Sequence, residues 1–377
     1  MIETPGLLLT VLAFVLVIGP LVFVHEMGHY LVGRWCGVKA EVFSIGFGNE
    51  VFGVTDRRGT RWKFGWLPLG GYVKFAGDLN AASQTDPAWL ALPAAERAQT
   101  FPAKPLWQRA LIIAAGPVVN FLLAILILMG FALIYGDVRT PPVAREIVAG
   151  SAAAKIGLQP GDRIVAVGGR SVETFDDVSR YVKIRANEPV QVDFDRGGTV
   201  LSRTAMIGTM EQRDRFGNEY QMGLLGIAPA RPVLIDVGVL EAPGVALRQT
   251  RDIVVTMVET LGQVISGRRS VKELGGPLRI AKISGEQISI GPEAFVFLIA
   301  LVSINLGFIN LLPIPMLDGG HLFFYAIEAI QRRPVNPAVQ EWAYRGGLMA
   351  LMMFMLFVTF NDLGAFGLWK NLASLIG

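Results

Sequence analysis

The stretch His25-Glu26-Met27-Gly28-His29 directly follows Leu7–Val24, a run of eighteen residues without a charge. On a helix, histidines four residues apart share one face, which suits one zinc ion with Glu26 beside it as a general base. Eighteen helical residues extend for about 27 Å, close to the thickness of the hydrocarbon core of a bilayer. The position of the motif therefore predicts a metal site in a membrane-spanning segment and a substrate that is also in the membrane.

The composition is that of a membrane protein. Of 377 residues, 52% are hydrophobic and 17% are charged, whereas soluble domains carry about a quarter charged residues. Apolar runs predict four membrane-spanning helices: Leu7–Val24 with a continuation to Gly33, Ala110–Tyr135, Ala294–Leu317 and Gly346–Phe360. No basic segment precedes the first run and no small-residue cleavage site follows it, so we expect a retained helix and not a signal peptide. The single cysteine, Cys36, excludes an intrachain disulfide.

The basic residues predict the orientation. Ten Lys and Arg residues lie between the first and second spans, and Arg332, Arg333 and Arg345 lie between the third and fourth. Short segments rich in Lys and Arg stay on the cytoplasmic side. The N-terminus, segment 137–292 and the C-terminus are then expected on the opposite side.

Two histidines do not complete a catalytic zinc site, which has three protein ligands and one open position. Asp318 is an ionisable residue at the end of the third apolar run, and such residues within membrane segments mark functional sites. The antiparallel order of the spans brings Asp318 to the same side of the membrane as His25 and His29. His321, the third histidine of the chain, is an alternative ligand, although we expect it near the site or at the surface.

The residues before Asp318 predict an interrupted helix. Pro313 and Pro315 would break the helix there, and the freed backbone groups need a cavity or neighbouring protein to satisfy them. Asn310 is placed to supply hydrogen bonds in that space.

These motifs together resemble one family. His25–His29 in the first helix, with N-x-x-P-x-P-x-L-D-G over residues 310–319, resembles the site-2 intramembrane zinc metalloproteases, and within them the bacterial regulator-of-sigma-E proteases. The likeness covers nearly the whole chain and includes three further stretches, residues 70–75 (GGYVKF), 116–121 (GPVVNF) and 270–277 (SVKELGGP). Several close members carry two tandem PDZ domains between spans two and three, whereas this chain has room for one.

The resemblance implies a role for each site residue. His25, His29 and Asp318 would bind one zinc ion, and Glu26 would take the proton of the attacking water and pass it to the leaving amine. Substrate-positioning residues would be Asn310, Pro313, Pro315, Asn120, Gly70, Gly71, Tyr72 and Val73. For Asn120 and Asn310, plain interhelical hydrogen bonding is the alternative.

A membrane-associated hairpin is predicted from residues 60–78, where aromatic and β-branched residues surround a Pro-Leu-Gly-Gly break. In the resembling family this element re-enters the membrane. Its exposed edge, including Gly70–Val73, would pair with an unwound substrate by strand addition. An ordinary interfacial hairpin anchored by Trp62 and Trp66 is the alternative.

Residues 150–169 combine a short helix, a Pro-Gly-Asp turn and a strand, a pattern that resembles a PDZ domain. We expect the groove helix at Thr174–Ile184, later strands at Val190–Phe194 and Val200–Met206, and a peptide-binding edge at Val143–Val148. A steric gate that excludes large external domains is equally compatible. Ala246–Ile265 mixes apolar and charged residues, as expected of an amphipathic helix on the membrane surface.

The expected fold is a polytopic α-helical membrane protein with four transmembrane helices, a membrane-associated β-hairpin and an inserted α+β PDZ domain. The expected segments are 1–36 (transmembrane helix 1), 37–105 (cytoplasmic or re-entrant β segment), 106–136 (transmembrane helix 2), 137–235 (periplasmic PDZ domain), 236–292 (periplasmic amphipathic surface segment), 293–320 (transmembrane helix 3), 321–345 (cytoplasmic loop) and 346–377 (transmembrane helix 4 and C-terminus).

The expected function is zinc-dependent intramembrane proteolysis of single-pass membrane proteins, in the bacterial inner membrane with the active site near the cytoplasmic side. By the resemblance, substrates would be anti-sigma-factor-like proteins after a first cleavage, or signal-peptide remnants; lipid is a partner and nucleic acid is not. An inactive membrane PDZ adaptor with a structural metal is the alternative, and Glu26 argues against it. A transporter is the third reading, disfavoured because no inverted repeat is visible.

Overall fold

The computed structural model describes residues 6–79, 87–213, 219–266 and 275–365, and it divides into two compact units. One unit comprises Met1–Leu128 and Gly275–Asp362, and the other Met129–Leu274 and Leu363–Gly377. Of the motif at 270–277, residues 270–274 lie outside the described residues, as do residues 366–377 of the predicted C-terminal segment.

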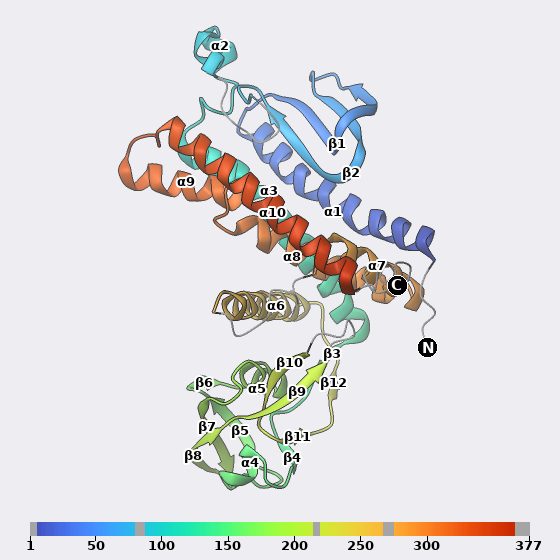
Figure 1. Cartoon of the computed structure of the whole chain (residues 1–377), viewed down its shortest axis with the longest axis vertical. Helices are drawn as coiled ribbons and strands as arrows, with labels where there is room; N and C mark the ends of the chain where they lie inside the picture. The colour runs from blue at the N-terminus through green and yellow to red at the C-terminus, as the bar shows by residue number, and fades with distance from the viewer. Residues whose placement is uncertain (1–5, 80–86, 214–218, 267–274, 366–377) are drawn as a thin grey trace, which may run out of the picture. The chain divides into compact units, whose positions relative to one another are not determined.

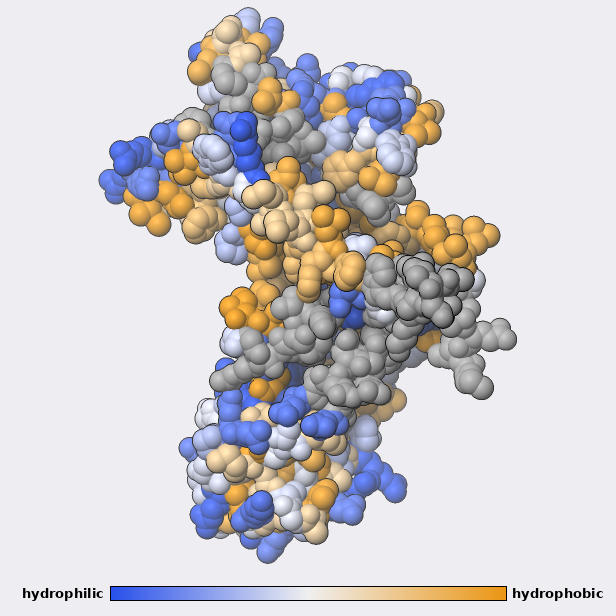
Figure 2. All heavy atoms as spheres, in the orientation of Figure 1, coloured by the Kyte–Doolittle hydropathy of each residue, from blue (hydrophilic) through white to orange (hydrophobic). Residues whose placement is uncertain are grey.

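Each of the four predicted spans coincides with a helix long and apolar enough to cross a membrane. These helices are α1 (Leu7–Trp35), α3 (Leu106–Tyr135), α8 (Pro292–Leu311) and α10 (Pro337–Ala365) (Figure 1). At most 39% of the residues in their most apolar windows are buried, and apolar side chains gather over α10 on the face seen in Figure 2. Exposed apolar surface on this scale suits lipid and not water, so the chain is a multi-pass membrane protein.

The third span ends earlier than predicted. The predicted span was Ala294–Leu317 with a break at Pro313 and Pro315; the structure confirms the break, because α8 stops at Leu311 and Asp318 opens a separate helix, α9 (Asp318–Gln331). Pro313 explains the break, because its ring pushes Leu312 into an extended conformation (φ −64°, ψ 142°). The connecting residues include Met316 in the left-handed region at φ 82°. Strained non-glycine residues of this kind cluster at functional sites.

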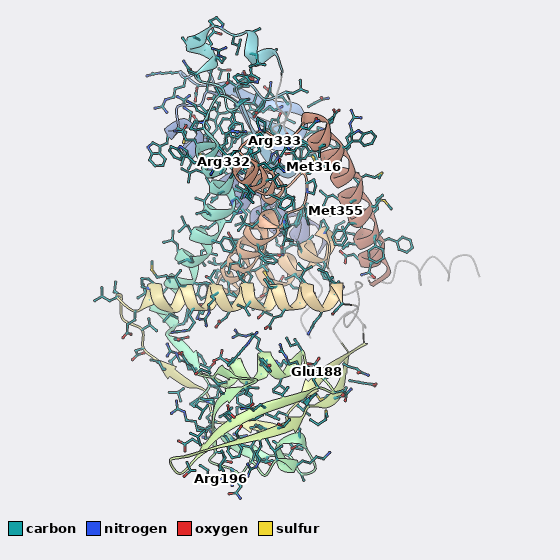
Figure 3. All side chains as sticks on the ribbon, turned by 90° about the vertical axis from the view of Figure 1, so that its left-hand side faces the viewer. Glu188, Arg196, Met316, Arg332, Arg333 and Met355 are labelled. Atoms are coloured by element: carbon teal, nitrogen blue, oxygen red, sulfur yellow. The ribbon has the colours of Figure 1, made fainter. Side chains whose placement is uncertain are left out.

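The prediction that residues 321–345 form a loop is also wrong. Most of it is helical, since α9 runs to Gln331 and α10 starts at Pro337. Only residues 332–336 connect the two helices. Arg332 ends α9 in a left-handed conformation (φ 53°), and it lies with Arg333 at this turn in Figure 3.

A hairpin is present, but it is formed by residues 40–75 and not within residues 60–78 as predicted, and its association with a membrane stays a prediction. Strands β1 (Ala40–Thr55) and β2 (Arg61–Phe75) are joined through a turn in which Asp56 Oδ1 accepts hydrogen bonds from the N–H groups of Arg58 and Thr60. The Pro-Leu-Gly-Gly break lies inside β2 instead. There the chain bends so that residues 42–45 of β1 pair with both 61–64 and 71–74 of β2. Gly70, at φ 95°, provides the backbone freedom for this bend.

Aromatic rings attach the hairpin to α1. Phe43 of β1 stacks on Trp62 of β2 with ring centres 4.5 Å apart, and Tyr30 of α1 meets both rings edge-on. Two short helices, η1 (Pro87–Ala91) and α2 (Ala94–Arg97), follow the hairpin before α3 begins.

The remaining helix of this unit is α7 (Pro277–Ile290), which packs against α1 and α8. Its N-terminus is capped from α10. The carboxylate of Asp362, fully buried, accepts hydrogen bonds from the backbone N–H groups of Gly276 (3.0 Å) and Arg279 (3.2 Å). The Arg279 guanidinium lies 3.7 Å from the second carboxylate oxygen. A helix N-terminus has unsatisfied N–H groups and a partial positive charge, so the carboxylate stabilises α7 on both counts.

The second unit contains the α+β module predicted at 137–235. A four-stranded sheet in the order β6-β5-β7-β8 forms its centre, around a core that includes Ile164, Val192 and Phe194. The helices and strands in chain order are β3 (Asp137–Arg139), β4 (Ala144–Ile147), α4 (Ala152–Lys155), β5 (Arg163–Val167), β6 (Arg170–Ser171), α5 (Phe175–Lys183), β7 (Pro189–Arg196), β8 (Thr199–Met206), β9 (Gly208–Arg213), β10 (Glu219–Leu224), β11 (Ile227–Pro229) and β12 (Val233–Ile235). The predicted helix at 174–184 and strands at 190–194 and 200–206 match α5, β7 and β8.

The predicted peptide-binding edge of this module, Val143–Val148, contains strand β4, and its binding of a peptide stays a prediction. Strand β4 pairs with β11 on one side, and on the other the Ile164 N–H donates to the carbonyl of Pro142 while Ala144 N–H donates to that of Asp162. These further contacts lie at the start of β4, and β4 and β11 form a two-stranded sheet. The turn that begins β5 is fixed by Arg196, labelled in Figure 3, whose guanidinium donates to both carboxylate oxygens of Asp162. These hydrogen bonds hold the pKa of Asp162 below its usual value.

Helix α6 (Ala242–Ile265) contains the predicted amphipathic segment. One side of it contacts the module, through ion pairs of Asp252 with Arg180 (3.2 Å) and Glu259 with Arg170 (3.3 Å). Leu247, Val258 and Ile265 remain more than half exposed on another side. Its position on a membrane surface stays a prediction.

Replacing Asp362 with alanine should destabilise the protein by about 3–5 kcal/mol, since it removes one partner of a buried ion pair and the cap of α7 together. Thermal unfolding of the purified protein in detergent measures this. The control is Glu341→Ala on the same helix, which breaks the exposed Glu341–Arg345 ion pair (2.6 Å) and should cost about 0–1 kcal/mol. Equal effects of the two variants would contradict the capping role.

Candidate active site

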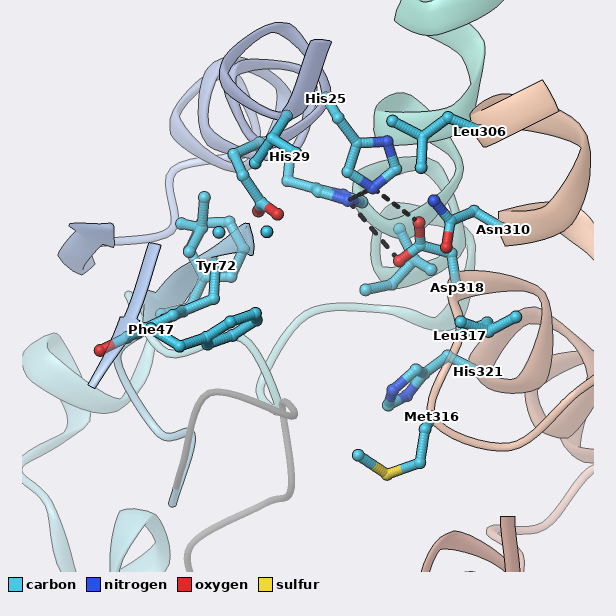
Figure 4. Close-up of a pocket in the computed structure, with 17 residues that line it drawn as sticks. His25, His29, Phe47, Tyr72, Leu306, Asn310, Met316, Leu317, Asp318 and His321 are labelled. Carbon is cyan, nitrogen blue, oxygen red and sulfur yellow. Dashed lines mark hydrogen bonds and ion pairs between the residues drawn. The ribbon is translucent and has the colours of Figure 1, made fainter. Parts of the chain in front are cut away.

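Three side chains that could bind a metal ion converge where α1 meets the start of α9 (Figure 4). His25 and His29 lie one turn apart on α1, and their Nε2 atoms are 3.3 Å from each other. Asp318 Oδ2 lies 3.2 Å from Nε2 of His25, and Oδ1 lies 3.6 Å from Nε2 of His29. Within the described residues, these three form the one group of His, Cys, Asp or Glu side chains whose ligand atoms all lie within 4.8 Å of one another.

Each imidazole is oriented by a hydrogen bond to its other nitrogen. Nδ1 of His29 donates to the backbone carbonyl of Ile112 on α3 at 2.8 Å. Nδ1 of His25 lies 3.0 Å from the side-chain amide of Asn120, also on α3. The structure has Nδ2 of this amide facing the ring. A histidine that binds metal through Nε2 carries its proton on Nδ1, so with metal bound the amide would be turned to present Oδ1 as the acceptor. That assignment also gives a partner to Asn120 Oδ1, a buried atom otherwise without one among the described residues.

Asn120 is therefore placed to orient a ligand and not to touch substrate. Its side chain is fully buried and does not line the cavity described below. Its backbone carbonyl accepts a hydrogen bond from Ser303 Oγ of α8 at 2.8 Å. The geometry thus favours the interhelical alternative for this residue.

Gly116 creates the space that the two histidine rings occupy. It lies on α3 opposite them, and a Cβ atom at this position would collide with Nε2 of His29 and lie 2.9 Å from Cε1 of His25. The sequence motif around residues 116–121 contained this glycine, but no pattern in the sequence revealed its role.

Glu26 faces a cavity of about 270 Å³ that adjoins the three donor atoms. Val73 of β2 lines the same cavity. The cavity is lined by α1, β2 and the α8–α9 connection, through residues that include His25, Glu26, His29, Phe47, Gly70, Gly71, Tyr72, Val73, Leu306, Asn310, Met316, Leu317, Asp318 and His321. Of the predicted substrate-positioning residues, Asn310 and Gly70–Val73 are thus brought to the site.

Pro313 and Pro315 do not line the cavity. They lie in the break between α8 and α9. Pro315 packs closely on α10 there, because a Cβ atom added to Gly347 would lie 2.6 Å from the Cβ atom of Pro315. Their role in the structure is to end α8 and to let Asp318 begin a new helix.

The donor set fits a zinc ion. Two imidazole nitrogens and a carboxylate oxygen are ordinary zinc ligands, and three of them leave one position open. Asp318 Oδ2 is buried and, in spite of its closeness to His25, lacks a hydrogen bond of good geometry. With Glu26 also buried nearby, two carboxylates share an apolar surrounding, which a divalent cation would stabilise.

His321 does not belong to the group of converging atoms in the described structure. It is buried on the wall of the same cavity, and its Nδ1 lies 3.0 Å from the hydroxyl of Tyr344 on α10. The expectation of a residue near the site, and not a ligand, agrees with this placement.

Comparisons with known proteins point to one family. The model of peptidase family M50 matches residues 13–354. A protein of Agrobacterium fabrum named as a candidate zinc metalloprotease is 46% identical, over 94% of this chain and 96% of its own. The metalloprotease MmpA of Caulobacter vibrioides is 36% identical, over 98% and 99%. The PDZ domain of an SdrC-like protein from Listeria monocytogenes gives a TM-score of 0.19 at 16% identity, covering 23% of this chain and 85% of that one.

Gly116→Ala should abolish zinc binding, because the added methyl group occupies the space of the His29 ring. Metal analysis of the purified protein measures zinc per chain. Gly130→Ala on the same helix is the matched control, since nothing lies within 4 Å of a Cβ there, and it should retain full zinc content. Normal zinc content in the Gly116 variant would show that the rings have another arrangement.

Proposed function

The chain belongs to peptidase family M50 and is a metalloprotease of the site-2 type, and from this premise we propose that it cuts single-pass membrane proteins in or near their transmembrane segments. One zinc ion is held by His25, His29 and Asp318, and Glu26 is the general base. Substrates are anti-sigma-factor-like proteins after a first cleavage, or signal-peptide remnants.

The observation that carries the proposal is the position of Glu26. It lies on the same cavity as the three converging ligand atoms, on a helix with a mean hydropathy of 2.9 over its most apolar window. Burying a carboxylate in such surroundings is energetically costly, so a carboxylate found there marks a functional site. A structural metal site would not need a fourth ionisable group beside its ligands, which argues against the inactive adaptor.

The chemistry divides between the metal and the chain. A bound zinc ion lowers the pKa of its water and polarises the peptide carbonyl. Glu26 accepts the proton of the attacking water and returns it to the leaving nitrogen. Asn120 and the Ile112 carbonyl keep the two imidazoles in the tautomer that leaves Nε2 for the metal.

The substrate has to be extended, because helical carbonyls are hidden in internal hydrogen bonds. Residues 71–74 of β2 pair with β1 on one side, and Gly71, Tyr72 and Val73 line the cavity that Glu26 also lines. The unpaired side of this strand therefore faces the cavity. Its position supports strand addition by an unwound substrate next to the base.

The rest of the chain selects and delivers the substrate. We place the enzyme in a bacterial inner membrane, with the site near the cytoplasmic side and a single PDZ module in the periplasm, as the distribution of basic residues predicts. The module either binds a peptide end along the edge at Val143–Val148 or excludes substrates that still carry a large external domain.

Glu26→Gln should keep one zinc ion per chain and lower cleavage of a reconstituted single-pass substrate by at least about a thousandfold, consistent with the loss of a positioned base. Metal analysis and gel-based cleavage assays on the same preparation test this. Asp318→Leu, by contrast, should lose both the metal and the activity. Sustained turnover by the Gln variant would refute Glu26 as the base.

A substrate that unwinds more easily should be cut faster. Replacing one leucine beside the cleavage site with glycine lowers helix stability by about 1 kcal/mol, which corresponds to about a fivefold higher rate if unwinding precedes cleavage. The same replacement two turns away is the control and should change the rate little. Equal effects at both positions would argue that the substrate binds as an intact helix.

A further inference from the structure

His321 is the one histidine that the proposed chemistry leaves without a task. It is 8% exposed, lies on the α9 side of the cavity and points from α9 into the region beside Met316 in Figure 4. Buried polar groups normally have hydrogen-bond partners, and an apolar side chain would fill this wall of the cavity equally well. The presence of an imidazole here therefore points to a polar partner.

Tyr344 fixes the ring of His321. The Tyr344 hydroxyl lies 3.0 Å from Nδ1 of His321. The centres of the two rings are 5.0 Å apart, with an angle of 33° between the ring planes. Tyr344 is itself buried and meets Phe324 edge-on, so its hydroxyl is held in place. When the hydroxyl donates to Nδ1, the neutral ring carries its proton on Nε2. No partner for Nε2 is present in the described part of the chain, which leaves it as a donor for whatever fills the cavity.

An extended substrate needs such a donor. A strand presents its backbone groups to both sides, and carbonyls of alternate residues point the same way, about 7 Å apart. On one side of the cavity the edge of β2 offers main-chain partners. On the other side lie the metal ligands, and His321 follows Asp318 by three residues on α9. A scissile carbonyl directed at the metal therefore places a second carbonyl along this same wall.

Resting on the proposed proteolytic function, we propose that His321 is a substrate-binding residue whose Nε2–H donates a hydrogen bond to a backbone carbonyl of the unwound substrate, opposite the β2 edge. Tyr344 is its positioning residue. Because the contact is to the main chain, it holds many sequences in register without selecting among their side chains. The carbonyl is not the one that reacts, so the bond is equally strong before and during the reaction.

The test is steady-state cleavage of a model transmembrane peptide of Leu and Ala with a central Gly pair, in detergent micelles. His321→Ala should raise KM about three- to tenfold, the loss expected for one neutral hydrogen bond, with kcat unchanged. His321→Gln, which keeps an N–H donor, should recover part of that loss. Tyr344→Phe should raise KM by less, and the control Tyr325→Phe, on α9 but away from the cavity lining, should not.

Two readouts besides turnover complete the test. Zinc per chain should be unchanged in His321→Ala, and in the Glu26→Gln background the Kd of the same peptide should rise by the same factor as KM. A fall in kcat at constant KM, a loss of zinc, or an unchanged KM would each overturn the proposal. A wild-type protein that binds zinc but cleaves no peptide would refute the proposed function itself, whereas normal wild-type cleavage with an unaffected His321→Ala variant would refute this inference alone.

Discussion

The structure depends on holding a carboxylate and two imidazoles together among apolar helices. Asp318 lies within 3.2–3.6 Å of the Nε2 atoms of His25 and His29, in surroundings where an unpaired charge is expensive. Most of the neighbouring polar contacts serve this arrangement. α3 supplies a carbonyl for one ring and an amide for the other, α8 anchors the residue with the amide, and Gly116 leaves the volume that the rings fill. The contacts between α1 and α3 thus include hydrogen bonds of the two histidines as well as apolar packing.

The same constraint accounts for the break between α8 and α9. A carboxylate at the end of a continuous helix would lie next to the negative end of the helix dipole, whereas at the start of α9 it lies next to the positive end. Ending α8 at Leu311 and starting again at Asp318 therefore stabilises the ligand that the site needs. The connection between the two helices is irregular, with the backbone of Met316 in the left-handed region. Met316 and Leu317 of this connection become part of the cavity wall.

The parts of the fold that follow from local pattern could be predicted from the sequence. The four apolar helices, the spacing of His25 and His29, and the elements of the α+β module each depend on residues close together in the chain. Asp318 was predictable as well, because a lone carboxylate stands out in an apolar run. Gly116 could not be identified this way. It contributes by lacking a side chain, and this matters only because the histidine rings of the facing helix α1 occupy that space. The hairpin turn depends on which distant segments pair, and composition does not encode that directly.

The cap of α7 has a consequence for how the protein is made. Asp362 belongs to the last membrane helix, whereas α7 precedes it by more than seventy residues and packs against the first helix. While the ribosome is still synthesising α10, the N-terminus of α7 has no carboxylate to satisfy it. α10 is synthesised after α7, so the cap of α7 forms only when α10 is in place, and a chain interrupted ahead of Asp362 would lack this cap.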